Sequence, residues 1–200
     1  MMSLCAIHSG NTMSRWEPDA AGRFRAAAME LFFERGYEQT SVADIAARAG
    51  LTARTFFRHF EDKREVLFDG SERLQEIMVS ALSGAPATAS PIDAVGAAVL
   101  ATAGFFSDNR EFGRKRHSVI VANAELRERE LIKMATLTAA LAEALRARGV
   151  AEPDASLAAE AGIAVFRVAF GLWVGESEQR SFAEIVEASL ARLRALAATN

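Results

Sequence analysis

The chain of 200 residues has little cysteine and no recognisable set of metal-binding side chains. Its single cysteine, Cys5, cannot form an intramolecular disulfide and excludes a cysteine-based zinc cluster. None of its histidines (His8, His59 and His117) follows a glutamate by three residues, so the Glu-x-x-His pairs of a di-iron bundle are absent. We expect no metal, no cofactor and a reducing, cytoplasmic setting.

Catalytic motifs are missing as well. The chain contains no HExxH zinc motif, no phosphate-binding glycine loop and no Gly-x-Ser-x-Gly nucleophile turn. We therefore expect that the protein is not an enzyme. A helical-bundle enzyme without a visible catalytic motif stays open as an alternative.

Long hydrophobic runs are also absent. Residues 1–14 lack the basic and apolar segments of a signal peptide, and we predict that they form a disordered leader. The longest stretch of low charge, Ala161–Gly175, is shorter than the ~20 residues of a membrane-spanning helix and contains Arg167. We predict no membrane association.

Signals for strands are lacking too. No alternating or hairpin pattern is present, and none of the four prolines interrupts a periodic apolar run. The many alanines favour helix. The sequence therefore predicts an all-α fold of about nine helices.

What the sequence does contain is a series of capped amphipathic helices. The first lies within residues 16–35 and ends at Gly36. Ser41 and Asp44 form a capping pair at the start of a short second helix, which ends at Gly50.

Thr52 caps the third helix, and the pair Asp62 and Glu65 is predicted to open a long fourth helix that continues to about residue 82. A linker follows at Gly84–Pro91. The five further predicted helices are Ile92–Ser107, Arg110–Ala122, Ala124–Arg148, Asp154–Val174 and Phe182–Ala198.

The second and third helices, joined by a tight glycine turn, have the layout of a DNA-binding helix-turn-helix. Because the net charge is -3, any contact with nucleic acid must come from a local basic patch. Between Ile45 and Phe60 the chain has Arg48, Arg54 and Arg58, one histidine and no acid. The alternatives are an amphipathic helix with a solvated basic face, or a helical protein-interaction module that binds an acidic partner.

The segment TSVADIAARAGLTARTFFRHFEDKREVL, Thr40–Leu67, resembles the DNA-binding segment of TetR-type transcriptional regulators. The matching positions are Thr40, Val42, Ile45, Ala46, Ala49, Gly50, Thr55, Phe60 and Lys63. The resemblance implies a helix-turn-helix DNA-binding domain over residues 15–62. It also implies a helical ligand-binding and dimerisation domain over residues 63–200.

The resemblance also implies which residues contact DNA. The candidates are Thr40, Thr52, Ala53, Arg54, Thr55, Phe57, Arg58, His59 and Lys63. Ala53 and Arg54 would reach base edges, and Arg54 can pair with guanine.

The family commonly has tyrosine where this chain has Phe57 and His59, and a small residue in place of Arg54. Phe57 would contact a thymine methyl, with core packing as its alternative. Phosphate contacts would come from Thr40, Arg58, His59 and Lys63, and a buried imidazole is the alternative for His59.

In this family the last two helices pair with their copies, which implies a homodimer and a palindromic operator. The helix that contains Ala161–Gly175 is apolar nearly all round, so it needs cover on two sides. Gly162, Gly171 and Gly175 would permit close approach of helices, with local irregularity of the helix as the alternative.

The family's ligand pocket lies among the middle helices, and ordinary core packing is the alternative for each candidate. The candidate lining residues are Phe105, Phe106, Phe112, Met134, Phe166, Arg167, Phe170 and Trp173. Arg167 is expected to be buried and so to need a partner, which we expect to be a carboxylate across the dimer interface rather than an anionic ligand. A second basic cluster, Arg110–His117, is either a solvated face or a contact for phosphate or an acidic ligand.

Together these features predict a dimeric, ligand-responsive repressor of a palindromic DNA operator. The resemblance implies that a small apolar effector releases it from DNA.

Overall fold

The computed structural model describes residues 19–106, 109–175 and 179–198, so the predicted leader 1–14 lies outside the described residues. The described part contains eleven helical segments and no strand. Two of the segments, α4 and α7, have four residues each, and the other nine have seven residues or more. The all-α prediction is confirmed, and two of the predicted helices are each divided in two.

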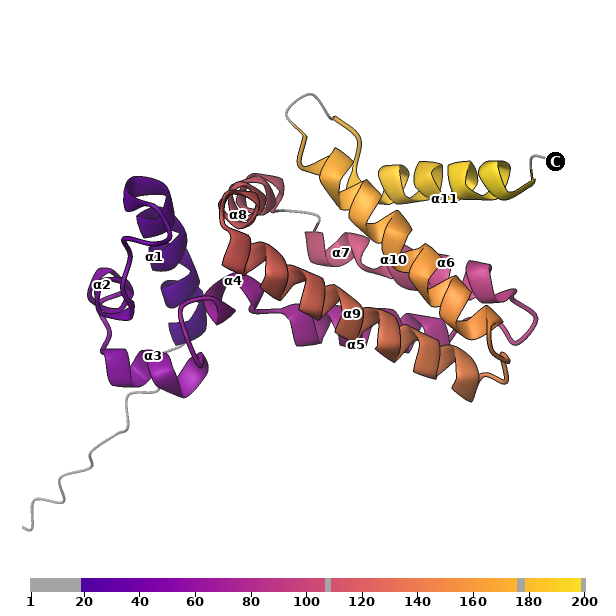
Figure 1. Cartoon of the computed structure of the whole chain (residues 1–200), viewed down its shortest axis with the longest axis horizontal. Coiled ribbons are helices and arrows are strands. Elements are labelled where there is room, and N and C mark those ends of the chain that lie inside the picture. The colour runs from indigo at the N-terminus through magenta and orange to yellow at the C-terminus, as the bar shows by residue number, and fades with distance from the viewer. Residues whose placement is uncertain (1–18, 107–108, 176–178, 199–200) are drawn as a thin grey trace, which may run out of the picture.

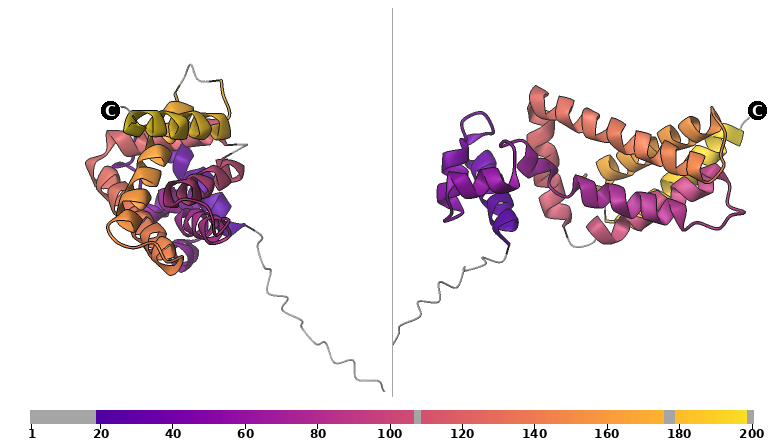
Figure 2. Two further views of the ribbon diagram at one scale, coloured as in Figure 1. Left: turned by 90° about the vertical axis from the view of Figure 1, so that its right-hand side faces the viewer. Right: turned by 90° about the horizontal axis from the view of Figure 1, so that it is seen from below.

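Helices α1 (Ala20–Arg35), α2 (Val42–Arg48) and α3 (Ala53–His59) form a small bundle at one end of an elongated molecule (Figures 1 and 2). The predicted caps are present. Ser41 accepts a hydrogen bond from the backbone N–H of Asp44 at 3.1 Å, and Thr52 accepts one from Thr55 at 3.1 Å. These bonds fix where the two short helices begin.

The prediction of one long helix from Asp62 to about residue 82 is wrong. It is divided into α4 (Glu65–Phe68) and α5 (Ser71–Ser83), because Asp69 leaves the helical conformation with ψ 132° and Gly70 has φ 92°. Asp62 accepts a hydrogen bond from the N–H of Glu65 at 3.3 Å, as a cap does. The Glu65 side chain does not complete the capping box, since it pairs with residues of α9 instead.

The helix predicted over Ile92–Ser107 is also divided. Helix α6 (Pro91–Ala101) is capped by Ser90, and α7 (Ala103–Phe106) follows it. The break lies at Thr102, whose buried hydroxyl donates to the carbonyl of Val99 at 2.7 Å.

The remaining helices begin and end within one residue of their predicted bounds. They are α8 (Arg110–Ala122), α9 (Ala124–Ala147), α10 (Asp154–Trp173) and α11 (Phe182–Ala198). Helix α10 is the one described helix long and apolar enough to cross a membrane. It packs along α6, α9 and α11, which accounts for its apolar composition as that of a core helix.

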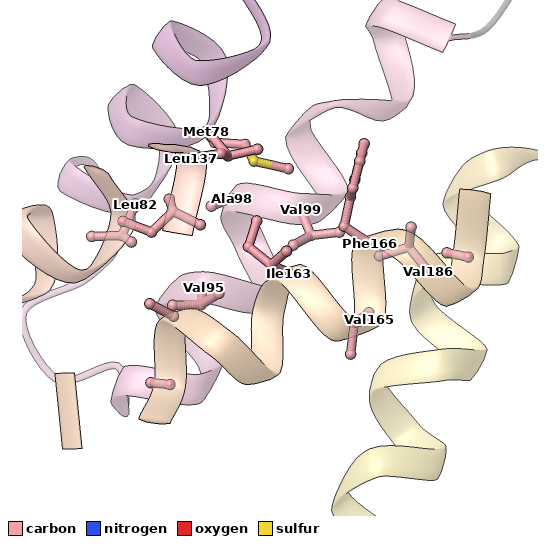
Figure 3. Close-up of a cluster of buried hydrophobic side chains, with 14 of the residues drawn as sticks. Met78, Leu82, Val95, Ala98, Val99, Leu137, Ile163, Val165, Phe166 and Val186 are labelled. Atoms are coloured by element: carbon pink, nitrogen blue, oxygen red, sulfur yellow. The ribbon is translucent and has the colours of Figure 1, made fainter. Parts of the chain in front are cut away.

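The described residues form two hydrophobic cores. The first joins α1 to α4 and includes Val119 and Ile120 of α8 and Leu126 of α9. The second joins α5, α6, α9, α10 and α11, and Figure 3 shows side chains of these helices meeting within it. The domain boundary at residues 62/63 stays a prediction, although α4 packs with the first core.

Close approach of helices depends on one of the three glycines predicted for it. A Cβ atom on Gly162 would lie 1.9 Å from Cγ1 of Val95, so α10 contacts α6 at a point where only glycine fits. Gly171 has no neighbouring atom within 4 Å, and Gly175 is nearest to the backbone of its own turn. Within the chain, close approach is therefore confirmed for Gly162, and for Gly171 and Gly175 it stays a prediction.

Candidate nucleic-acid interface and ligand cavity

Helix α3 is held by its inner face and exposes its outer face. Phe56 and Phe60 are 0% and 6% exposed, and their ring centroids lie 5.1 Å and 6.2 Å from that of Phe24 on α1. Phe57 is 58% exposed, and Arg54 is exposed as well. Core packing is therefore wrong for Phe57, and α3 presents an aromatic ring beside a guanidinium to its surroundings.

The other predicted contacts on α3 are also accessible. Arg58, His59 and the cap Thr52 are exposed, and Ala53 and Thr55 are half-buried. The His59 ring lies 6.3 Å from that of Phe24, at the edge of the core. Burial of this imidazole, the alternative left open by the sequence, is wrong.

The turn between α2 and α3 is tied to α1. Gly50 has φ 66°, and the N–H of Leu51 donates to the carbonyl of Ala46 at 2.9 Å. Arg23 of α1 donates to the carbonyl of Ala49 at 2.5 Å. The angle between the two short helices is thus fixed by backbone bonds rather than by side-chain packing alone.

The basic patch is smaller than its arginines suggest. Arg48 pairs with Glu34 at 2.7 Å and with Glu30 at 3.0 Å, both on α1. Its hydrogen bond holds the pKa of Glu34 below the ordinary value. Within the described residues Arg54 and Arg58 form no such pairs, so these two arginines supply the exposed positive charge of α3.

Thr40 and Lys63 have structural partners that the sequence did not indicate. Thr40 is 1% exposed, and its hydroxyl donates to the carbonyl of Gly36 at 2.8 Å. Lys63 donates to the carbonyls of Tyr37 and Thr40 at 2.9 and 3.2 Å, and its Nζ lies 4.1 Å from the centre of the Tyr37 ring. The burial of Thr40 does not favour the phosphate contact predicted for it, and the contact predicted for Lys63 stays a prediction.

Helix α4 is tethered to α8 and α9 by charged side chains. Glu65 pairs with Arg129 at 2.7 Å and with Lys133 at 3.1 Å. Burial alone would raise the pKa of Glu65, but the hydrogen bonds from these two cations outweigh burial and hold the pKa below its ordinary value.

Arg116 of α8 supplies the second part of the tether. Its Nε donates to the carbonyl of Leu67 at 2.5 Å, and its guanidinium lies 5.1 Å from the centre of the Phe68 ring. It also pairs with Glu130 of α9 at 3.4 Å. Burial lowers the pKa of Arg116 and the charge of Glu130 opposes that shift. The position of α4 therefore depends on residues of both α8 and α9.

A cavity of about 420 Å³ lies beside this tether. Seven of the eight predicted ligand residues line it, namely Phe105, Phe106, Phe112, Met134, Phe166, Arg167 and Phe170. Trp173 does not, because it is 2% exposed and packs against Phe182, with ring centroids 5.7 Å apart. Arg167 is exposed in the single chain, and the carboxylate partner predicted for it across a dimer interface stays a prediction.

The polar part of the cavity wall was largely missed from the sequence. It consists of Arg25, Asp69, Ser71, Asn109, Arg116, His117, Glu130, Lys133 and Arg167. Arg116 and His117 belong to the cluster Arg110–His117, for which contact with an acidic ligand was one alternative. Nothing in the local pattern of α9 separates Glu130 and Lys133 from its solvent-facing charges. No cluster of three potential metal ligands occurs among the residues the structure describes.

Helices α10 and α11 expose an apolar face. Leu157, Val168 and Leu172 on α10 are 64%, 57% and 48% exposed, and Leu196 on α11 is 62% exposed. Large apolar side chains grouped in this way are typical of surfaces that bind another protein. The extra apolar face expected from the sequence is thus present on these two helices.

Two segments of the chain match described families. Residues 24–69 match the bacterial regulatory proteins of the tetR family, and residues 89–198 match the MftR C-terminal domain. The regulator TcmR of Streptomyces glaucescens, of the helix-turn-helix type, is 40% identical over 81 residues, which are 40% of this chain and 36% of TcmR. The chain spans half or less of the length of the curated relatives it matches.

Solved structures share the fold. A TetR-family transcriptional regulator of Syntrophomonas wolfei superposes with a TM-score of 0.64 at 20% identity, covering 90% of this chain and 95% of that one. The repressor FadR of Thermus thermophilus, solved with lauroyl-CoA, has a TM-score of 0.54 at 25% identity and covers 87% of this chain and 93% of its own.

Proposed function

Because the chain belongs to the TetR family of bacterial regulatory proteins, we propose that it is a dimeric repressor that binds a palindromic DNA operator and is released by a small-molecule effector. The observation that carries this proposal is the outward face of α3, where Arg54 and Phe57 are exposed on a helix fixed from behind by Phe56 and Phe60. A helix held in this way enters the major groove without losing its support.

In this proposal Arg54 and Phe57 read bases. Arg54 pairs with guanine and Phe57 contacts a thymine methyl, while Ala53 permits close approach. Arg58 and His59 bind phosphates, together with the hydroxyls of Thr52 and Thr55 at the start of the helix. Lys63 also binds a phosphate in this proposal, provided that the phosphate displaces the carbonyls of Tyr37 and Thr40 from its ammonium group.

The apolar face of α10 and α11 supports a twofold dimer. Val168, Leu172 and Leu196 would be covered by the same residues of a second copy, and two α3 helices would then contact two half-sites. A regulator that binds bacterial DNA acts in the cytoplasm, and this is the localisation that the proposal implies.

The cavity supports regulation by an effector, and FadR was solved in complex with lauroyl-CoA. Leu67 and Phe68 of α4 line the cavity, and Arg116 and Lys133 belong both to its wall and to the α4 tether. A ligand that displaces these groups moves α4 and with it the bundle α1 to α3. It lowers operator affinity only to the extent that it binds the displaced state more tightly.

The family consists of regulators, which favours this role over an enzyme. The remaining alternative is a protein-interaction module whose α3 face binds an acidic protein. Selection of bound fragments from the source genome tests the two directly, followed by mobility shifts at two salt concentrations with competitor DNA. The repressor predicts sequence-selective retention that weakens with salt, whereas equal retention of selected and random DNA would overturn it.

A further inference from the structure

The charges of the cavity wall do not balance. Three of its four cations have carboxylate partners: Arg25 with Asp69 at 3.1 Å, Arg116 with Glu130 at 3.4 Å, and Lys133 with Glu65 at 3.1 Å. Arg167 has no ion-pair partner among the described residues. Of the three carboxylates only Asp69 and Glu130 line the cavity, so the wall carries more positive than negative charge and attracts an anionic group.

His117 adds a second unmatched group. Its Nδ1 atom is buried and has no hydrogen-bond partner among the described residues, although buried polar atoms are normally paired. The imidazole lies edge-on to Phe170 at 5.9 Å between ring centroids, and Phe170 follows Arg167 by three residues on α10. Nδ1 donates a hydrogen bond when it carries the proton, so an acceptor oxygen satisfies it.

The apolar part of the wall is mainly aromatic. Six phenylalanines line the cavity, and Phe105 and Phe112 are still 37% and 38% exposed there. Phe166 and Phe170 are nearly parallel, with 19° between their planes and 6.3 Å between their centroids. Ring pairs in offset or edge-on arrangements contribute beyond the area they bury, so this wall favours a flat aromatic body over a flexible chain.

We propose that the cavity binds an aromatic acid, with its ring system among the six phenylalanines and its anionic group at His117 and Arg167. This inference depends on the proposed function only in treating the cavity as the effector site. It goes further by naming the chemical class and by assigning the head-group contacts to two residues.

Three probes separate the elements of this proposal in fluorescence titrations of the full chain without DNA. They are 1-pyrenebutyrate, its neutral counterpart 1-pyrenebutanol, and dodecanoate as a competitor without rings. We expect pyrenebutyrate to bind about tenfold or more tightly than pyrenebutanol, as a charge-assisted hydrogen bond implies, and dodecanoate to compete at least about tenfold less well. Equal affinity for the acid and the alcohol would overturn the anionic group, and equal competition by dodecanoate would overturn the aromatic body.

Variants test the two assigned contacts. We expect Arg167→Gln and His117→Leu each to remove most of the preference for the acid while binding of the alcohol is retained. We expect His117→Asn to keep the preference for the acid, since the amide nitrogen of asparagine lies near the position of Nδ1. We expect Arg167→Lys to keep it as well, because lysine retains the positive charge. Lys115→Gln is the matched control, because Lys115 is exposed, lies two residues from His117 and does not line the cavity.

The assignment is overturned if Lys115→Gln lowers the acid preference as much as Arg167→Gln, since a general charge effect would then explain it. Operator binding is measured separately on the same preparations. Operator binding without acid preference contradicts the ligand class and leaves the repressor intact. Acid preference without operator binding contradicts the repressor and leaves the ligand class intact.

Discussion

The side chains of α3 divide by face, and this division followed from the sequence alone. Phe56 and Phe60 are four residues apart and so share the inner face, while Arg54 and Phe57 fall on the outer one. The partners of Lys63 could not be predicted in the same way. Its hydrogen bonds reach the carbonyls of residues 23 and 26 positions earlier, and no local spacing indicates a contact at that separation.

Arg54 is the residue that tests base reading. We expect Arg54→Ala to weaken binding to the selected operator by about 1–3 kcal/mol and to relax the preference at one base pair. Arg58→Ala should instead weaken all sequences evenly and lower the slope of affinity against salt by about one ion. Mobility shifts on operator and random DNA distinguish them, and an equal loss on both for Arg54→Ala removes it from base reading.

Lys63 is expected to act on stability as well as on DNA. Lys63→Met keeps the aliphatic stem but removes the ammonium that bonds the carbonyls of Tyr37 and Thr40. We expect a loss of about 1–3 kcal/mol in the free energy of unfolding, measured by urea denaturation. Lys63→Arg is the control that keeps the charge. An unchanged unfolding midpoint in Lys63→Met would show that the ammonium contributes nothing to the fold.

At the scale of helices, the caps were predictable and the breaks were not. Ser41 and Thr52 bond to groups three residues away, so their roles are encoded locally. The break between α4 and α5 depends on Gly70, where a Cβ atom would lie 3.1 Å from the ring of Phe105, a residue 35 positions later. Apolar periodicity continues through the break, which is why the sequence predicted one helix.

The α4 tether leads to a prediction about pH. Glu65→Gln removes the charge that binds Arg129 and Lys133, and at neutral pH we expect a loss of about 1–3 kcal/mol in the free energy of unfolding. Because the folded pKa of Glu65 lies below its ordinary 4.5, this contribution is complete above about pH 4.5. It disappears as the pH falls through the folded pKa.

Urea denaturation of the wild type and the variant near pH 7 and near pH 4 measures this difference. It should be smaller at the lower pH. Glu72→Gln on α5 is the matched control, since Glu72 is exposed and forms no ion pair among the described residues. A difference that stays constant between the two pH values would show that the charge of Glu65 is not what stabilises α4.

For the whole molecule, the family was evident from one segment, Thr40–Leu67, whereas the internal arrangement of the second core was not. Apolar composition marked six of the predicted residues that line the cavity, and charge within an apolar helix marked the seventh, Arg167. It could not mark their polar neighbours, because Glu130 and Lys133 resemble any other charges on a long helix. The dimer could not be predicted from the pattern of one chain either, because its interface is completed by residues of a second chain.

The proposed dimer is tested on its apolar face. Val168 is 57% exposed, and Val168→Glu would place a carboxylate between the two copies of α10. We expect dimer dissociation to become at least about tenfold easier in sedimentation experiments. Operator binding should weaken in parallel. Ala139→Glu on the exposed side of α9 is the control, and an equal effect of both variants would place the interface elsewhere.

Gly70 couples two properties of this molecule in a way that bears on its evolution. Its φ of 92° separates α4 from α5, and its missing Cβ leaves room for the ring of Phe105 at the cavity wall. A mutation there changes the connection to the DNA-binding bundle and the shape of the effector site at once. A lineage that acquires a new effector is therefore expected to change the other wall residues and to keep glycine at this position.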